Sequence, residues 1–179
     1  MKVSMNAERV REDRLLDMMN RHGQALLRMC VVYLRDAALA QDAVQETFVK
    51  AYKGMDAFRS ESSEKTWLMR IGLNACKDIR RNAWYRYVDR RVTLQNVPQP
   101  IVAPSDDQAD MAMAVTKLPR KYLDVVLLYY YQGMTIREAA EVLKIPNQTV
   151  SARLKKAREK LRAMLEGGQY NGTTDLTGY

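Results

Sequence analysis

Apolar residues recur at helical spacing along most of this chain. In residues 8–34 they predict an amphipathic helix, whose inner face would consist of Leu15, Leu16, Met19, Leu26, Leu27, Cys30, Val31 and Leu34. Gly23 lies near the middle of this segment and predicts a bend or a break there. A second helix is predicted over residues 36–55, where Asp36 is placed to cap the first turn.

A third helix is predicted from Ser63 or Lys65 to about Arg90. Its buried stripe would consist of Trp67, Leu68, Ile71, Ala75 and Ile79. An exposed basic face is predicted by the helical spacing of Arg70, Asn74, Lys77 and Arg81, with Arg80 beside them. Basic side chains bind a phosphate backbone, and an Asn can make a bidentate contact with a base edge. Residues 84–90 interleave aromatics with arginines, which suits either melted nucleic acid or a packed helix end.

The helical pattern fails over residues 92–107. Prolines at positions 98, 100 and 104 forbid a helix and favour an extended path, so we expect an interdomain linker. Asp106 or Asp107 is placed to cap the helix that follows. Pro119 then suits the first turn of another helix, and Gly133 suits its end.

Residues 135–165 predict two helices joined by a tight turn. Thr135 and Glu138 have the spacing of a capping box. The turn would be residues 144–146, with Asn147 as the N-cap of the second helix. That helix has a buried stripe of Val150, Leu154, Ala157, Leu161 and Leu165. Its other faces are mostly basic, which favours a DNA-binding helix-turn-helix over the alternative, an ordinary helical hairpin with a solvated basic face.

Composition supports an all-α protein with a polyanionic partner. The chain has 179 residues, 47% of them hydrophobic, and only 8 glycines and 5 prolines. Its net charge of +8 favours nucleic acid over a membrane surface. We expect two small helical domains, residues 8–91 and 108–166, joined by a flexible linker at 92–107, with the helix-turn-helix in the second domain. Residues 167–179 are expected to be a disordered tail.

Several classes of site find no support in the sequence. There is no Gly-rich phosphate loop, no His/Cys cluster with metal spacing and no Ser-His-Asp set, so we expect no enzyme, cofactor or metal. Cys30 and Cys76 are expected to be buried thiols, with a disulfide or redox switch as the alternative. His22 is assigned a surface or helix-packing role. No apolar run suits a membrane span or a signal peptide, so the protein is expected in the cytoplasm.

Two further features allow two interpretations each. The polar pair Gln45 and Glu46, near Asp42, is either solvated surface or a docking face for a basic partner. Phe58 is an aromatic in a polar loop. It either closes the top of the core or stacks on a base, with Arg59 beside it for a phosphate.

Three segments together resemble the bacterial sigma factors, in the extracytoplasmic-function (ECF) group. They cover residues 36–52, 58–81 and 118–162, in the order of the family. The most specific part is D-x-x-Q-E-x-F (residues 42–48) followed by T-W-L-x-x-I-x-x-N-x-x-x-D (residues 66–78). The chain lacks the extra middle domain and acidic N-terminal extension of larger sigma factors, which supports the ECF assignment.

The resemblance implies roles for the first domain. Asp42, Gln45 and Glu46 would dock on the β′ clamp helices of core RNA polymerase, which would also be contacted through its β flap. Promoter −10 DNA would be bound by Phe58, Arg59, Ser60, Glu61, Ser62, Arg70, Asn74, Lys77, Arg80 and Arg81. The loop and Asn74 would hold a base flipped out of the −10 element, which couples recognition to strand opening.

The resemblance also implies that the second domain binds the −35 element. The residues assigned to it are Gln148, Thr149, Ser151, Ala152, Arg153, Lys155, Lys156 and Arg158. Family members often have Arg-Ser where this chain has Ser151 and Ala152, and Gly in place of Gln148, so the −35 sequence is left open. An anti-sigma factor is implied as a further partner, and the free chain is expected to be a monomer.

Two other functions compete with promoter recognition. A stand-alone helix-turn-helix regulator would normally dimerise, and no dimerisation heptad is present. A DNA-processing enzyme such as a recombinase would need a nucleophile or metal cluster, and the first domain shows none.

Overall fold

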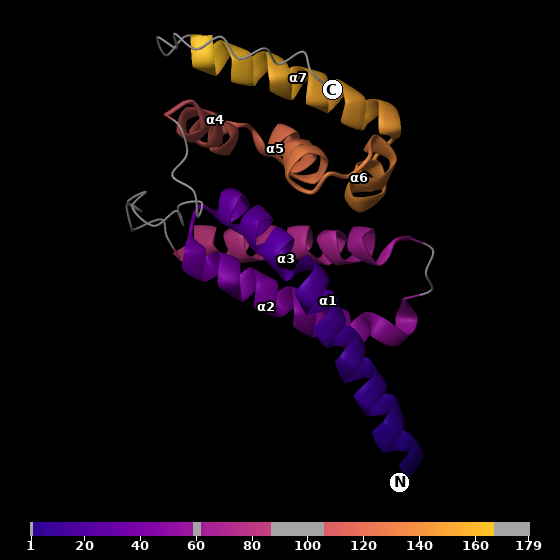
Figure 1. Ribbon diagram of the computed structural model, residues 1–179. Coiled ribbons are helices and arrows are strands. Elements are labelled where there is room, and N and C mark those ends of the chain that lie inside the picture. The colour runs from indigo at the N-terminus through magenta and orange to yellow at the C-terminus, as the bar shows by residue number, and fades with distance from the viewer. Residues whose placement is uncertain (1, 59–61, 87–105, 167–179) are drawn as a thin grey trace.

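The computed structural model describes residues 2–58, 62–86 and 106–166, and every regular element in these ranges is helical (Figure 1). The N-terminal unit consists of α1 (Lys2–Leu34), α2 (Ala37–Gly54), the short 3-10 turn η1 (Met55–Ala57) and α3 (Glu64–Arg86). The C-terminal unit consists of α4 (Asp106–Lys117), α5 (Arg120–Val126), the π-helical turn η2 (Leu127–Tyr131), α6 (Ile136–Leu143) and α7 (Asn147–Glu166). The predicted all-α fold of two helical domains is confirmed.

Two stretches with sequence predictions lie outside the described residues. They are 87–105, which holds most of the predicted linker, and 167–179, the predicted tail. The linker was predicted to extend to residue 107, but α4 already begins at Asp106. Asp106 and Asp107, one of which was expected to cap this helix, therefore both lie in its first turn.

The first helix continues without interruption through Gly23. Of the two alternatives predicted at Gly23, a bend or a break, the break is therefore wrong. A mid-helix glycine costs about 1 kcal/mol relative to alanine. Here the turns on both sides are anchored, since Met18 and Leu26 are fully buried. Tertiary packing therefore outweighs the local preference.

Helix α3 is central in the molecule and buries more than the predicted stripe. Leu68 and Ala75 are fully buried as expected, but Trp67, Ile71 and Ile79 are only half-buried. Met69, Leu73 and Cys76 lie in the core instead. The inner side of α3 is thus rotated from the predicted one. At Gly72 a Cβ atom would come within 2.4 Å of Leu26 Cδ1, so any larger residue would require the buried Leu26 side chain to shift.

Local capping rules explain the helix ends near the predicted turns. Asp36 accepts a hydrogen bond from the Leu39 backbone N–H, which confirms it as the N-cap of α2. Thr135 and Glu138 form the predicted capping box at the start of α6. Gly133, with a φ of 60°, ends the preceding turn. In contrast, the prediction of Asn147 as an N-cap is wrong. The Pro146 carbonyl accepts from the Val150 N–H, so Pro146 is the capping position and Asn147 is the first helical residue.

The two units meet along one side of α3, as Figure 1 shows, where α4, α5 and α6 lie between α3 and α7. We call this contact the seam and define it by Lys65, Arg70 and Lys77 of α3 and by Asp124, Gln132 and Glu141 of the C-terminal unit. The Gln132 side chain also donates to the Ala25 carbonyl of α1 over 2.8 Å. The polar groups that form the seam include two of the predicted DNA-binding residues of α3, Arg70 and Lys77.

Candidate nucleic-acid and partner interfaces

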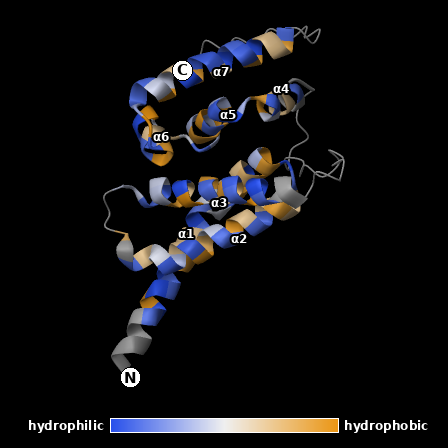
Figure 2. Cartoon of the chain, turned by 180° about the vertical axis from the view of Figure 1, so that it is seen from behind, coloured by the Kyte–Doolittle hydropathy of each residue, from blue (hydrophilic) through white to orange (hydrophobic). Residues whose placement is uncertain are grey.

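Helix α7 presents a basic face to solvent because its opposite side is buried. Val150, Leu154, Ala157 and Leu161 are all within the core, as predicted. Most residues assigned to DNA on this helix are exposed, namely Gln148, Ser151, Ala152, Lys155, Lys156 and Arg158, whereas Thr149 and Arg153 are half-buried. In the hydropathy view of Figure 2, α7 is largely hydrophilic along its length. This geometry suits insertion into a major groove.

Among the exposed α7 cations assigned to DNA, Lys155 and Arg158 are available to bind phosphates or base edges. Lys155 and Arg158 make no ion pair within the part of the chain that the structure describes. Lys156 instead lies 2.9 Å from the Glu159 carboxylate, whose hydrogen bond raises the pKa of this lysine. The Ser151 hydroxyl donates to the Asn147 carbonyl over 3.2 Å, so its oxygen keeps acceptor capacity for a base.

The predicted basic face of α3 is only partly open to solvent, since Arg70 and Lys77 are half-buried. Arg70 donates to the Glu141 carbonyl over 3.0 Å and lies 3.3 Å from the Glu141 carboxylate. Lys77 lies 3.1 Å from the carboxylate of Asp124. The prediction of a single exposed face is therefore wrong for Arg70 and Lys77. Helical spacing places them on one side of α3, but α5 and α6 cover that side.

Asn74 does remain exposed, because it lies toward α2 rather than toward the seam. Between α2 and α3 is a pocket of about 460 Å³ lined by Lys50, Gly54, Trp67, Ile71, Asn74 and Asp78. The pocket combines an aromatic edge, an amide and both charge signs. Such groups are suited to stacking and hydrogen-bonding with an unpaired base.

Phe58 packs beside this pocket. Its ring stacks on Trp67 with 4.8 Å between the ring centroids. The guanidinium carbon of Arg14 lies 5.7 Å from the centroid of the Phe58 ring. The packing interpretation is thus supported by direct contacts, and stacking on a base remains a prediction. Arg59, Ser60 and Glu61 lie outside the described residues, and Ser62 is half-buried.

The remaining assigned cations of α3 lie near its C-terminal half. Arg81 is exposed and pairs with Asp78 at 3.0 Å. Arg80 is half-buried, and burial, followed by repulsion from Arg120, lowers its pKa. Arg81 therefore retains access to a nucleic-acid backbone, whereas Arg80 is held close to the C-terminal unit.

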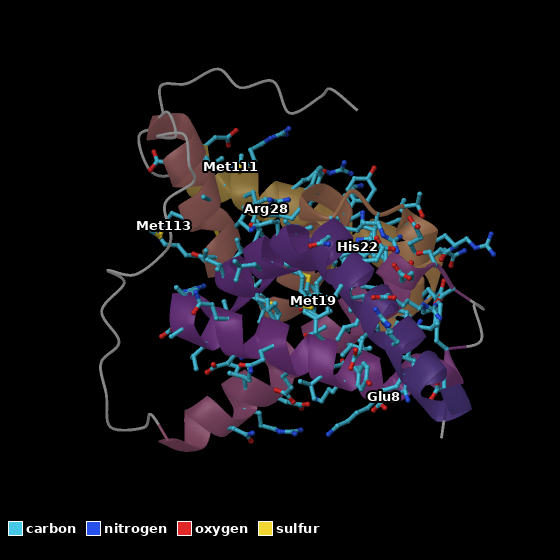
Figure 3. All side chains as sticks on the ribbon, turned by 60° about the horizontal axis from the view of Figure 1, so that its bottom comes forward. Glu8, Met19, His22, Arg28, Met111 and Met113 are labelled. Atoms are coloured by element: carbon cyan, nitrogen blue, oxygen red, sulfur yellow. The ribbon has the colours of Figure 1, made fainter. Side chains whose placement is uncertain are left out.

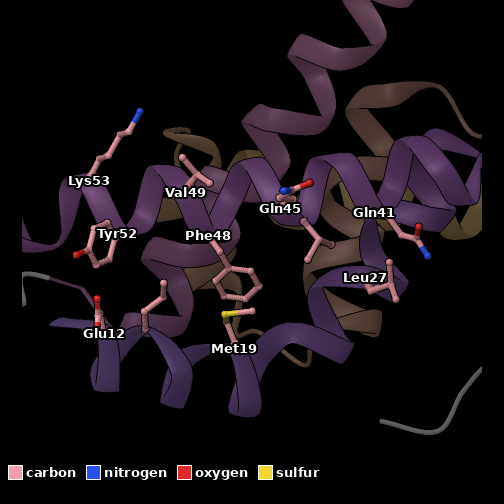
Figure 4. Close-up of a pocket in the computed structure, with 11 residues that line it drawn as sticks. Glu12, Met19, Leu27, Gln41, Gln45, Phe48, Val49, Tyr52 and Lys53 are labelled. Atoms are coloured by element: carbon pink, nitrogen blue, oxygen red, sulfur yellow. The ribbon is translucent and has the colours of Figure 1, made fainter. Parts of the chain in front are cut away.

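Helix α2 carries the residues assigned to polymerase docking. Asp42 and Gln45 are exposed, and Glu46 is half-buried and pairs with Lys50 at 2.7 Å. Gln45 also borders an apolar groove of about 690 Å³ between α1 and α2. Figure 4 shows Phe48 of α2 and Met19 of α1 pointing toward each other in this groove. The groove was not predicted from the sequence, which placed Met19 on the inner face of the first helix. In the structure Met19 is 42% exposed and Val49 is 47% exposed.

The two cysteines and the histidine occupy packed positions in the N-terminal unit. No set of three or more His, Cys, Asp or Glu residues with metal-binding geometry occurs among the described residues. Cys30 and Cys76 are free buried thiols, as predicted. The neighbouring Cys30 side chain, together with burial, raises the pKa of Cys76 and keeps it a thiol. His22, which Figure 3 labels on α1, is 3.4 Å from Glu64 and has the helix-packing role predicted for it.

The acidic partners of α3 were not identified from the sequence. Asp124 interrupts the apolar residues of α5 and is 7% exposed, and a charge at such a position needs a partner. That interruption was the available signal. Glu141 gave none, since an acidic residue on an amphipathic helix is ordinarily solvated. Separately, no helix in the described ranges is both long and apolar enough to cross a membrane.

Comparison with known proteins places both units in one family. Residues 18–86 match the family Sigma-70 region 2, and residues 108–161 match Sigma-70, region 4. The chain is 30% identical to the ECF RNA polymerase sigma factor SigW of Bacillus subtilis, covering 86% of this chain and 90% of SigW. It is 31% identical to the RNA polymerase sigma factor CnrH of Cupriavidus metallidurans, covering 82% and 83%.

Two solved structures share the fold. CnrH in complex with the cytosolic domain of CnrY superposes with a TM-score of 0.68 at 29% identity, covering 87% of this chain and 90% of that one. The sigma factor RpoE of Bartonella quintana, in complex with the anti-sigma factor NepR, has a TM-score of 0.69 at 22% identity, covering 84% and 97%.

Proposed function

This chain belongs to the sigma-70 family of RNA polymerase sigma factors, in the ECF group, and we propose that it binds core RNA polymerase, directs it to promoters through −10 and −35 elements, and promotes strand opening. The observation that carries the proposal is the exposed basic face of α7, held outward by a buried stripe within a capped helix-turn-helix. Sigma factors are initiation factors, and we assign no catalytic step to the chain.

The −35 element would be read by α7. Gln148, Lys155 and Arg158 have the reach to contact base edges and phosphates, while Ser151 and Ala152 are short. Ser can hydrogen-bond to several bases, and Ala can contact only a thymine methyl group. Readout at those two positions would therefore be weak, with DNA shape contributing more.

The −10 element would be bound by the N-terminal unit as a partly opened strand. The pocket next to Asn74 is the place we assign to an extruded base, with Trp67 at its edge. Extruding a base costs a few kcal/mol, which stacking and hydrogen bonds in the pocket would offset. The loop at 58–63 would complete the pocket, and Arg81 would hold the neighbouring backbone.

Core polymerase would dock on α2. The exposed carboxylate of Asp42 and amide of Gln45 suit a partner rich in arginine, and rim charges would speed and orient the encounter. We also propose an anti-sigma factor as a regulatory partner, because similar sigma factors have been solved in complex with CnrY and NepR. On this proposal residues 8–91 and 108–166 are the two functional domains.

A run-off transcription screen tests the proposal. Purified chain and core polymerase are incubated with a pool of genomic fragments, and transcripts with defined start sites are expected. Core polymerase without the chain is the control. The absence of any chain-dependent start site would contradict the proposal.

Point variants distinguish binding to core polymerase from opening of the promoter strands. Asp42→Arg and Gln45→Ala should weaken binding to core polymerase, measured by fluorescence anisotropy, without changing the melting temperature. Asn74→Ala should bind core normally but reduce strand opening, measured by permanganate reactivity of unpaired thymines at a promoter found in the screen. If Asn74→Ala weakened core binding as much as strand opening, the role assigned to Asn74 in holding an extruded base would be contradicted.

One observation keeps the stand-alone regulator as a second candidate. Because the face of α7 is open in the free chain, it would allow duplex binding without polymerase. Light scattering distinguishes the two. A stable dimer that binds a palindromic duplex tightly would favour the regulator, and a monomer that needs core polymerase would favour the sigma factor.

A further inference from the structure

Three arginines lie where the end of α1, the C-terminal half of α3 and the start of α5 approach one another. The guanidinium carbon of Arg120, the first residue of α5, lies 5.9 Å from the ring centroid of Tyr33, which is fully buried on α1. Arg35 directly follows α1, Arg80 lies on α3, and both are half-buried. Within the described residues, none of these three arginines forms an ion pair with a carboxylate.

The packing of α3 on α1 explains the position of Arg80. Helix α3 meets α1 at Gly72, where a Cβ atom would come within 2.4 Å of the Leu26 side chain. Four residues further along both helices, the side chain of Cys76 meets that of Cys30. The two helices therefore advance in the same direction, and one further turn brings Arg80 level with the end of α1.

The seam aligns α5 with the same end of α3. Lys77 of α3 lies 3.1 Å from the carboxylate of Asp124 on α5. Arg120 precedes Asp124 by one helical turn, so the two residues share a side of α5. Arg120 therefore faces the end of α1, where it lies over the Tyr33 ring.

Arg35 has a backbone conformation that arginine rarely adopts. Its φ is 58°, in the left-handed region, where glycine is the favoured residue because a Cβ atom is crowded there. An arginine at a strained position points to a use for its side chain.

The arginines carry more positive charge than the described chain neutralises. Burial, followed by repulsion from Arg120 and then from Arg35, lowers the pKa of Arg80. The nearby carboxylate of Asp124 is already paired with Lys77. An anion from outside the described residues would relieve this repulsion.

The Tyr33 hydroxyl adds a donor without an acceptor. It is buried and has no hydrogen-bond partner among the described residues, which is costly for a polar group. Burial, followed by the charge of Asp124, raises the pKa of Tyr33 to about 12, so the hydroxyl keeps its proton at neutral pH. It can therefore donate to a bound anion.

We propose that Arg35, Arg80 and Arg120, together with the Tyr33 hydroxyl, bind a terminal phosphate or diphosphate group. Guanidinium groups donate paired N–H bonds to phosphate oxygens, and a terminal phosphate carries about two negative charges near pH 7. A carboxylate or a DNA backbone phosphate carries one charge and would leave most of the repulsion in place. The site goes beyond the proposed function and shares only Arg80 with the residues assigned to −10 DNA.

Calorimetric titration of the full chain with inorganic diphosphate tests the site, with ionic strength held constant by chloride. Saturable binding of one diphosphate per chain is expected. A nucleoside diphosphate, titrated in parallel, should bind and compete with it, since both present the same terminal group. The absence of saturable binding by both would overturn the inference. So would displacement of diphosphate by a short single-stranded DNA, because a backbone phosphate would then be the ligand.

Two substitutions by glycine give a matched comparison. Arg35 and Lys144 both have a left-handed backbone, with φ of 58° and 53°, so Arg35→Gly and Lys144→Gly each remove one positive charge without straining the chain. Both should keep the wild-type melting temperature or exceed it. Arg35→Gly should weaken the Kd for diphosphate roughly tenfold or more, and Lys144→Gly about twofold or less. Equal weakening would overturn the inference, because the attraction would then reflect net charge.

Two further variants test the other donors. Arg120→Gln removes an exposed charge, and it should weaken the Kd for diphosphate roughly tenfold. Tyr33→Phe removes only the hydroxyl, and it should weaken the Kd about threefold to tenfold. Neither should lower the melting temperature, since the hydroxyl makes no hydrogen bond within the described chain. Unchanged affinity in both variants would overturn the inference.

Discussion

Helices α3 and α7 carry similar basic repeats, but the structure gives them different surroundings. Arg70 and Lys77 of α3 are paired with acidic residues more than 40 positions away along the chain, whereas Lys155 and Arg158 of α7 have no such partner among the described residues. The difference shows that periodic charge identifies the side of a helix and leaves open what packs against it.

The physical reason lies in the position of each helix. Helix α7 is the outermost element and is buried along one stripe only, as Figure 1 shows. Helix α3 contacts α1 and α2 on one side and α6 on another. Its polar side is therefore an internal interface. The outer surfaces of the molecule remain open, including Met113 on α4, which is 44% exposed (Figure 3).

Removing a buried side chain of α7 should have the largest effect. Leu154 is 4% exposed, and Leu154→Ala should lower the free energy of unfolding by about 2–5 kcal/mol because it leaves a cavity. Met164→Ala is the control on the same helix, since Met164 is 37% exposed, and it should change stability by about 0.5 kcal/mol or less. Urea unfolding followed by circular dichroism measures both. Equal losses would show that α7 is not held by one stripe.

Two glycines of the N-terminal unit should respond in opposite ways to replacement by alanine. Gly72→Ala places a methyl group 2.4 Å from the buried Leu26 side chain and should destabilise the fold by about 1–3 kcal/mol. Gly23→Ala meets nothing within 4 Å and should stabilise it by roughly 0.4–1 kcal/mol. Thermal unfolding gives the sign of each change. Stabilisation by Gly72→Ala would mean that α3 is not tightly packed on α1.

The salt dependence of duplex binding should differ between variants of one lysine from α7 and one from α3. Lys155→Ala should reduce the slope of log K against log salt by about 1, because it removes one phosphate contact. Lys77→Ala should leave the slope nearly unchanged in the free chain, since Asp124 already pairs with Lys77. Fluorescence titrations between about 50 and 200 mM salt measure both slopes. Equal reductions would show that Lys77 contacts DNA while the seam is closed.

The smallest effect is expected from Asp124→Asn. Burial raises the pKa of Asp124 above its ordinary value of 3.8, although Lys77, Arg120 and Arg153 oppose the shift. The folded form therefore binds the proton at higher pH than the unfolded chain does. As pH falls from 7 toward 3.8, this carboxyl adds stability, and as pH rises again that contribution is lost.

Asp124→Asn should accordingly match or slightly exceed the wild-type stability at pH 7, and its advantage should shrink as the pH approaches the ordinary Asp range. Thermal unfolding of both proteins from pH 7 to about 4 measures the difference. A loss of about 2 kcal/mol or more at pH 7 would show that the ion pair with Lys77 outweighs the cost of burial.

The sequence by itself determined the features that depend on neighbouring residues. Thr135 and Glu138 form a capping box, and Asp36 caps α2, because each contact spans three positions. The buried stripe of α7 follows from a 3.6-residue period on a helix that packs on one side only. The two-unit all-α fold follows from these local patterns and from the proline-rich interruption between them.

Only the tertiary structure decided which polar groups are free. The Arg70–Glu141 contact joins residues 71 positions apart, and the Gln132–Ala25 contact joins residues 107 apart. No local rule relates such residues, since their proximity depends on how two helical units are oriented. For the same reason the rotation of α3, the groove between α1 and α2, and the separation of Asn74 from Arg70 and Lys77 were not predictable. Burial and partner choice are properties of the packed molecule, and periodicity is a property of the chain.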